Sequence, residues 1–384
     1  MVAAVRRKRP LRQVAREFGV SPATVHYWVE HAKGQRLDRV DWHDRSRAPR
    51  NPPRTEAAIE EQVLAVRREL ERTSDLGFHG AEVIHQVLSA RKVGGLPTVR
   101  TIGRILRRRG VLDGQVHVRR PAPTAGWYLP EVAANRQELD CFDVVEGLVI
   151  KGGPQVEVLD GVSLHGGLAV SWPHEASITA KVVVGRLIEH WKEVGLPGYA
   201  QFDNDTIFQG PHAHPDTIGR VTRLCLSLGV VPVFVPPREP GFQAIIEGFN
   251  GTWQAKVWAR FAHASLSDLE GRSSRFVAAH RRYRADRIEA APRRRPFPTR
   301  WRLNLQARPR GRIVFLRRTD ASGKVAMLGR VFDVDEHWLN RLVRAEVDLD
   351  RGLIRFHRLR RREPSEQPLI KQTAYRFPGK KFHD

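Results

Sequence analysis

The N-terminal third of the chain carries the spacing of amphipathic helices. In the first of them, apolar side chains recur at i, i+3, i+4 and i+7, as the inward face of a helix requires: Leu11, Val14, Ala15 and Phe18. Gly19 interrupts the pattern, and Ser21 with Pro22 predicts the cap and the first position of a second helix. We therefore expect a helix, a short turn and a capped helix, the order of a helix-turn-helix motif.

In helix-turn-helix proteins the second helix enters the major groove of DNA. Polar positions at and after the predicted cap are therefore candidate DNA-binding residues: Ser21, Thr24, His26 and Tyr27. The alternative is a small helical hairpin that binds no ligand. We assign residues 1–45 to a helix-turn-helix DNA-binding domain, followed by a polar, Pro-rich linker at 46–53.

A second helical region covers residues 54–118. Its last helix is expected to begin at a Thr98 cap and to carry an apolar face: Val99, Ile102, Ile105 and Leu106. Arg100 and Arg104 lie on the same predicted helix, where they form either a second DNA-reading face or a solvated basic surface. We assign this region to a second helical DNA-binding domain, and residues 119–130 to another linker.

Strand and helix patterns alternate through the centre of the chain. Predicted strands cover 139–150, 156–162, 167–172, 199–202 and 230–235. Helical spacing occupies 178–194, 217–228 and 242–258. Three strands followed by alternating helices and strands predict a mixed sheet covered by helices, which we place within residues 131–285.

The C-terminal region consists of short β-like runs separated by Gly or Asp turns. These runs predict a small SH3-like β-barrel at 310–360. The basic segment 361–384 is expected to be a poorly ordered tail. The fold class expected for the whole chain is multidomain α+β, with helical modules in front of a mixed α/β core and a barrel behind it.

Charge is distributed unevenly along the sequence. The net charge is +23, yet residues 121–250 hold 8 Lys and Arg against 15 Asp and Glu, a net charge of −7. Basic flanks fit a polyanionic partner such as nucleic acid. An acidic centre would repel that partner unless cations lay between them. A soluble protein that is simply rich in arginine is the plainer alternative.

Composition excludes two classes of protein. Two cysteines supply neither a disulfide framework nor a Cys-rich zinc site, so a reducing, cytoplasmic compartment is expected. No run of about 18 apolar residues occurs. We therefore expect no membrane association.

Acidic side chains occur at unusual places in the central region. Asp203 directly follows the predicted strand 199–202, and Glu247 lies among apolar residues on the predicted helix 242–258. Asp140 and Asp143 lie inside the first predicted strand, where an acid is costly unless it is paired or metal-bound. Simple ion pairs are one explanation. A cation shared by the strand, the strand end and the helix is the other.

This order of acids resembles the DDE-type integrase core shared by bacterial insertion-sequence transposases and retroviral integrases. Residues 202–205, Phe-Asp-Asn-Asp, are similar to the second acidic motif of that family. Residues 236–252 are similar to the third, in which a Pro-rich loop leads into the helix that bears the glutamate: Pro-Pro-Arg-Glu-Pro-Gly-Phe-Gln-Ala-Ile-Ile-Glu-Gly-Phe-Asn-Gly-Thr. Compared with the family, residues 210–220 look like an insertion.

The resemblance implies a ribonuclease H-like core whose catalytic and metal-binding residues are Asp143, Asp203 and Glu247. The distances from Asp143 to the following turn and strand suit the family better than those from Asp140, and both remain candidates. Three carboxylates of this kind imply two Mg²⁺ ions, or Mn²⁺ in their place, about 4 Å apart.

The activity implied is cleavage of phosphodiester bonds and DNA strand transfer. Its partners would be double-stranded DNA, as element ends and as target, and further copies of the chain in a homo-oligomer associated with the bacterial nucleoid. One alternative is a DNA-binding regulator, derived from a transposase, whose core has lost catalysis. Another is a general metal-dependent nuclease, which cuts DNA without joining it.

Overall fold

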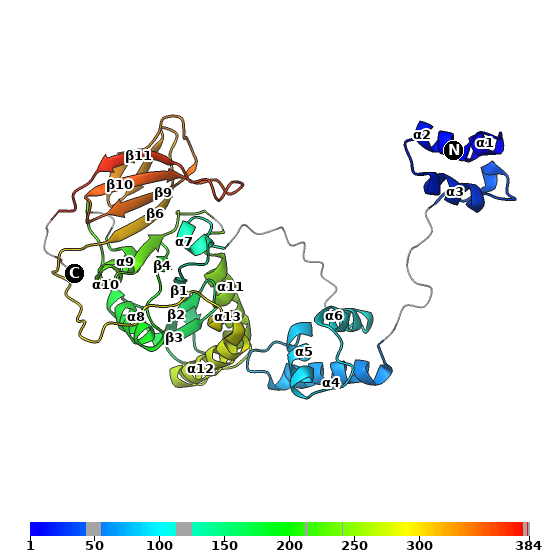
Figure 1. Ribbon diagram of the computed structural model, residues 1–384. Helices are drawn as coiled ribbons and strands as arrows, with labels where there is room; N and C mark the ends of the chain where they lie inside the picture. The colour runs from blue at the N-terminus through cyan, green and yellow to red at the C-terminus, as the bar shows by residue number, and fades with distance from the viewer. Residues whose placement is uncertain (44–54, 113–124, 212–213, 240, 379–381, 383–384) are drawn as a thin grey trace. The chain divides into compact units, whose positions relative to one another are not determined.

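The computed structural model describes residues 1–43, 55–112, 125–211, 214–239, 241–378 and 382. The chain divides into two compact units, Met1–Ala57 and Ala58–Asp384 (Figure 1). The predicted linker at 46–53, and the first half of the one at 119–130, lie outside the described residues. The predicted boundaries of the two helical domains and of the central core therefore stay predictions.

The first unit is a small cluster of short helices. They are α1 (Val2–Arg6), α2 (Leu11–Glu17), α3 (Pro22–His31) and the 3₁₀ turn η1 (Leu37–Arg39). The helices α2 and α3 confirm the two that the apolar spacing predicts, and α1 is an addition to them. Ser21 caps α3, because its side chain accepts a hydrogen bond from the Thr24 amide at 3.1 Å.

A three-helix bundle opens the second unit. It consists of α4 (Ala57–Thr73), α5 (Ala81–Ala90) and α6 (Val99–Arg108). Val63, Ile84 and Ile102 are fully buried where the helices meet. The side chain of Thr98 accepts a hydrogen bond from the Thr101 amide and caps α6, as its position before the apolar face predicts.

A nine-stranded mixed sheet forms the centre of the second unit. Its strand order is β11-β10-β9-β6-β5-β4-β1-β2-β3. The strands are β1 (Leu139–Val149), β2 (Gln155–Ser163), β3 (Ala169–Glu175), β4 (Tyr199–Phe202), β5 (Val231–Phe234), β6 (Arg312–Arg318), β9 (Leu342–Asp348), β10 (Leu353–Arg358) and β11 (Leu369–Ala374). The β1–β4, β4–β5 and β5–β6 pairs are parallel and the remaining pairs are antiparallel. The predicted mixed α/β core is confirmed.

Helices cover both faces of this sheet (Figure 1). They are α7 (Pro130–Ala133), α8 (Ala180–Val194), α9 (Thr206–Gln209), α10 (Arg220–Ser227), α11 (Ala244–Trp253), the π-helical turn η2 (Gln254–Trp258), α12 (Leu266–Tyr283) and α13 (Ala285–Glu289). Phe142 and Phe202 pack with α8, α9 and α10 on one face. Cys141 and Val145 pack with α11 and α12 on the other. The alternation of side chains along β1 thus separates two cores. Among the described residues, no helix has the length and apolar character needed to cross a bilayer.

The C-terminal strands differ from the expected separate barrel. β6 pairs in parallel with β5, which places Phe315 beside Phe234, and β9, β10 and β11 extend the same sheet. Only β7 (Lys324–Met327) and β8 (Arg330–Asp333) form a pair of their own among the described strands. The expected barrel at 310–360 is corrected to an extension of the core sheet, because β6 pairs with the core strand β5.

The prediction of a poorly ordered tail at 361–384 is also wrong in part. Residues 369–374 form β11, which pairs antiparallel with β10 along its length. Polar residues such as Lys371 and Gln372 can occupy such an edge strand because one side of the strand faces solvent.

Candidate active site

Strand register brings two of the predicted acids together. β1 and β4 pair in parallel, with Leu139 opposite Tyr199 and Cys141 opposite Gln201. Continued by two residues, this register places Asp143 level with Asp203. Neighbouring strands lie about 4.8 Å apart. Asp143, inside β1, therefore lies beside Asp203, which directly follows the end of β4.

Asp140 lies on the opposite face of the sheet from Asp143. Successive side chains of a strand alternate, so residues three apart point in opposite directions. Asp140 is 2% exposed and accepts hydrogen bonds from Arg294 at 2.5 and 3.0 Å and from the indole nitrogen of Trp191 at 3.1 Å. A complete set of buried partners therefore accounts for this acid.

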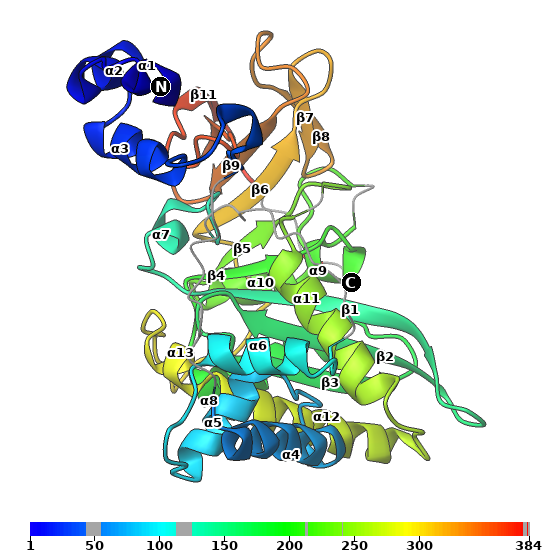
Figure 2. The ribbon, with the colours of Figure 1, turned by 90° about the vertical axis from the view of Figure 1, so that its right-hand side faces the viewer.

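The third predicted acid, Glu247, lies on the first turn of α11 and is exposed. Figure 2 shows α11 crossing the sheet over β1 and β2, which it contacts. Ile246 and Trp253 are fully buried and anchor the helix. The side-chain amide of Gln201 donates to the carbonyl of Phe242 at 2.9 Å, which ties the start of the helix to β4.

Asn250 is a residue of this site that the sequence analysis did not identify. It lies one helical turn after Glu247, and its amide nitrogen donates to Oδ2 of Asp143 at 2.9 Å. Residues three apart share one side of a helix, so the spacing from Glu247 was the available signal. Among the described residues, Oδ1 of Asn250 is buried with no hydrogen-bond partner.

The carboxylates of Asp143 and Asp203 repel one another. Burial, followed by the charge of Asp203, raises the pKa of Asp143 to about 6, and Glu247 adds to the rise. Burial also raises the pKa of Asp203, with contributions from Asp205 and Glu146. Holding like charges close together in a partly buried site costs free energy, and a bound cation would remove that cost.

A further acid, Asp160, lies beside Asp143 on the side away from Asp203 and was also missed. On β2 it is the cross-strand partner of Asp143, and on its other side it faces Ser171 of β3. It is 0% exposed, and burial raises its pKa well above the ordinary value. The sequence did contain a signal for Asp160, because it lies within a predicted strand, where burying an acid is costly unless it is paired or binds a ligand.

A preformed metal centre is absent from the part of the chain that the structure describes. No three Asp, Glu, His or Cys side chains within it lie close enough to hold an ion. The donor chemistry nevertheless fits a hard divalent cation. The Asp143 and Asp203 carboxylates repel each other, and the buried Oδ1 of Asn250 lacks a partner beside them. Approach of the exposed Glu247 side chain would complete such a site.

The predicted DNA-binding residues of the first unit lie on or next to α3. His26 and Tyr27 are exposed on that helix. Ser21 and Thr24 hydrogen-bond to each other through their hydroxyls at 2.8 Å, in addition to the cap. Their role in the helix end is thus established by contacts, while DNA binding by all four stays a prediction.

The predicted DNA-binding residues of the second unit lie on α6. Arg100 and Arg104 are exposed and one helical turn apart. Arg108 and Arg109, later on the same helix, both pair with Glu60 of α4. Contact of Arg100 and Arg104 with DNA stays a prediction.

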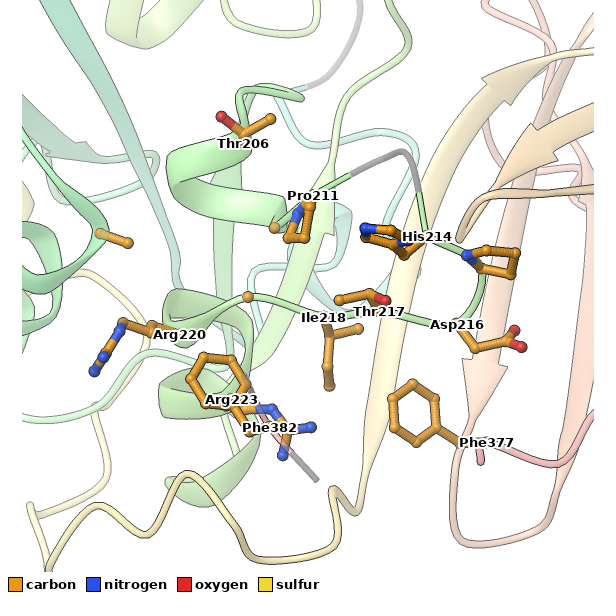
Figure 3. A pocket seen from close by; sticks show the side chains of 14 residues that line it. Thr206, Pro211, His214, Asp216, Thr217, Ile218, Arg220, Arg223, Phe377 and Phe382 are labelled. Carbon is orange, nitrogen blue, oxygen red and sulfur yellow. The ribbon is translucent and has the colours of Figure 1, made fainter. Parts of the chain in front are cut away.

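A cavity of about 950 Å³ lies apart from the acids. Figure 3 shows Ile218 and Arg223 lining it, together with Phe377 from the segment after β11. Its walls include residues of the segment 210–220 but none of Asp143, Asp203 or Glu247. None of the three acids therefore belongs to this cavity.

Comparisons with known proteins give weak similarities. No protein-family model matches the chain, and no curated protein matches it. The catalytic core domain of BIV integrase is 17% identical, with 37% of this chain and 81% of that chain covered and a TM-score of 0.28. A chain of the simian T-cell lymphotropic virus intasome, solved with the PP2A regulatory subunit B56 gamma, is 13% identical, with 72% and 92% covered and a TM-score of 0.32. Scores this low carry no conclusion about fold or activity.

The raised pKa of Asp143 predicts a pH-dependent stability. The pKa of Asp143 in the folded protein, about 6, exceeds the ordinary 3.8, because the fold favours the protonated carboxyl. The stability of the folded state that depends on this proton is fully present below about pH 4 and is lost as pH rises through about 6. Two pKa units correspond to roughly 3 kcal/mol. We expect Asp143→Asn to be more stable than the wild type by about 1–3 kcal/mol at pH 8 without metal.

Urea unfolding at pH 4, 6 and 8 in the presence of a chelator measures this effect. The gap in unfolding free energy between variant and wild type should widen from pH 4 to pH 8. Asp286→Asn, which removes an exposed acid from α13, should leave the wild-type profile unchanged. A gap for Asp143→Asn that stays constant across this range would contradict the prediction.

Proposed function

We propose that this protein is a DNA transposase or integrase that cuts and joins DNA strands with a ribonuclease H-like core. The observation that carries the proposal is the register of β1 and β4, which sets Asp143 level with Asp203 beneath the helix that bears Glu247. The site lies in the acidic central region of a protein whose net charge is +23. The carboxylates are proposed as the catalytic triad.

Asp143, Asp203 and Glu247 would hold two Mg²⁺ ions, or Mn²⁺. When bound, such ions activate water or a DNA 3′-hydroxyl for in-line attack and stabilise the leaving oxygen. Asn250 orients Asp143 through its hydrogen bond of 2.9 Å. The backbone amide of Asp205 donates to Oδ1 of Asp203 at 2.9 Å and fixes the rotation of that carboxylate.

The basic helices would bind the double-stranded DNA on which the core acts. Tyr27 and His26 of α3 and Arg100 and Arg104 of α6 are exposed and suited to that role. Joining requires two element ends and a target to meet, so we propose that the chain acts as a homo-oligomer. We place it on the nucleoid, in the cytoplasm of a bacterium.

A second candidate function is a DNA-binding regulator with an inactive core. The exposed position of Glu247, and the lack of a ready metal cluster among the described residues, favour it. Such a protein would bind its DNA site in the presence of a chelator and never cut it. A general metal-dependent nuclease would cut DNA and leave the products unjoined.

The deciding experiment uses the full chain and DNA that carries the repeats flanking its gene. We expect strand cleavage and joining to target DNA in Mg²⁺ or Mn²⁺, and neither reaction in chelator. If the protein binds its DNA in chelator and cleaves it with neither metal, the protein is the DNA-binding regulator and the proposal is wrong. Cleavage without joined products would replace it by the nuclease.

A further inference from the structure

A buried arginine from the C-terminal sheet extension reaches the turn that bears Asp203. Arg317 lies on β6 and is 6% exposed. Its Nη2 donates to Oδ1 of Asn204 at 2.8 Å. The two residues are far apart in sequence, and they meet because β6 pairs with β5 in the core sheet.

The same guanidinium also holds the end of β5. Its Nη1 donates to the carbonyls of Val235 at 3.0 Å and Leu316 at 2.8 Å, and its Nε donates to the carbonyl of Ala326 at 3.2 Å. The amide nitrogen of Asn204 donates to the same Val235 carbonyl at 2.7 Å. Arg317 and Asn204 therefore form one closed hydrogen-bonded unit with the strand end.

The charge of Arg317 is costly in this place. Across the described residues, none of its hydrogen bonds or ion pairs is to a carboxylate, and its partners are carbonyl oxygens and one side-chain amide. Burial lowers its pKa to about 10, which leaves it charged at neutral pH. Apolar side chains would fill the same space at less cost, so packing alone does not explain an arginine here.

The turn that it contacts carries the second acid. Asn204 directly follows Asp203, and Asp205 caps α9 by accepting from the Ile207 amide at 2.8 Å. Because Asp205 is held by α9 and Asn204 is held by Arg317, the backbone that follows Asp203 has little conformational freedom. The direction of the Asp203 carboxylate then depends on the C-terminal sheet extension.

We propose that Arg317 is a positioning residue that sets the Asp203 carboxylate for metal binding by clamping Asn204. The inference rests on the proposed function for its catalytic consequence, but the clamp itself exists in the metal-free protein. Groups that orient metal ligands typically change metal affinity or activity by about 10–100-fold when removed.

The test compares Arg317→Lys and Asn204→Ala with a matched control, Arg344→Lys. Arg344 lies on the neighbouring strand β9, is 4% exposed and donates to the carbonyl of Tyr128 at 2.9 Å. Three quantities are measured: Mn²⁺ binding by titration, the Mg²⁺ dependence of DNA cleavage, and hydrogen exchange of residues 203–209 without metal.

We expect Arg317→Lys to fold, to weaken Mn²⁺ binding by about 10–100-fold and to raise the Mg²⁺ concentration for half-maximal cleavage. Exchange in residues 203–209 should accelerate in Arg317→Lys and Asn204→Ala and stay at the wild-type rate in Arg344→Lys. The double variant should be no worse than either single one, because both break the same clamp.

Wild-type metal response and wild-type exchange in folded Arg317→Lys would overturn the proposal. So would additive effects of the two substitutions. If the wild type neither binds Mn²⁺ nor cuts DNA, the proposed function fails instead. In that case the metal-free exchange rates still decide whether Arg317 clamps the turn.

Discussion

Asp203→Asn is expected to lower the rates of DNA cleavage and joining by about 10³-fold or more. The register of β1 and β4 sets Asp203 beside Asp143, where burial and mutual repulsion favour a shared cation. Metal ions in such sites contribute several kcal/mol of transition-state stabilisation, and each 1.36 kcal/mol is a factor of ten in rate. Initial rates on labelled end DNA in Mg²⁺ measure the loss.

Asp205→Asn is the matched control for this substitution. It removes an acid two residues away, while asparagine still caps α9 as well as aspartate does. Cleavage should change by only a few-fold. Glu247→Gln should behave like Asp203→Asn, and both variants should bind DNA as the wild type does. Full activity of Asp203→Asn or Glu247→Gln would contradict the assignment of the catalytic triad.

Arg294→Met is expected to destabilise the second unit by about 3–5 kcal/mol. Asp140 is 2% exposed, and removal of Arg294 leaves its carboxylate with one side-chain donor among the described residues, the indole of Trp191. Breaking a buried ion pair on one side costs this much because an uncompensated charge stays buried. The melting temperature should fall on the order of 10 °C.

Thermal unfolding of Arg294→Met beside Arg293→Met measures this cost. Arg293 is exposed, so its replacement should change the unfolding free energy by less than about 0.5 kcal/mol. Adding Asp140→Asn to Arg294→Met should restore most of the loss, because the stranded charge disappears. An equal, small effect of both arginine substitutions would contradict the role given to the pair.

Metal binding by single variants separates the two neighbouring acids of β1. Asp140→Asn should keep the wild-type Mn²⁺ affinity, because that side chain faces α8 and Arg294. Asp143→Asn should lose most of it. The opposite pattern, in folded proteins, would assign the first ligand to Asp140. The sequence left this choice open, because both acids lie in one predicted strand.

Local patterns predicted the elements that carry strong periodicity. β4 has the bounds expected for it, and α8 and β2 differ by two residues or fewer at each end. The helix α12 was missed because its buried face includes Ser273 and His280, so the apolar spacing is broken. β11 was missed because its two large apolar residues, Leu369 and Ile370, are adjacent and give no strand alternation.

The sequence by itself determined the helices and strands, the separation of basic flanks from an acidic centre, and three acids at positions that needed a reason. Only the tertiary structure decided which acids meet. Pairing between β1 and β4 joined Asp143 to Asp203, and strand alternation turned Asp140 toward Arg294. It also joined β6 to β5 and so brought Arg317 to Asn204. Periodicity reports which side of an element is buried, whereas contacts between distant segments depend on register and strand order, which local spacing does not encode.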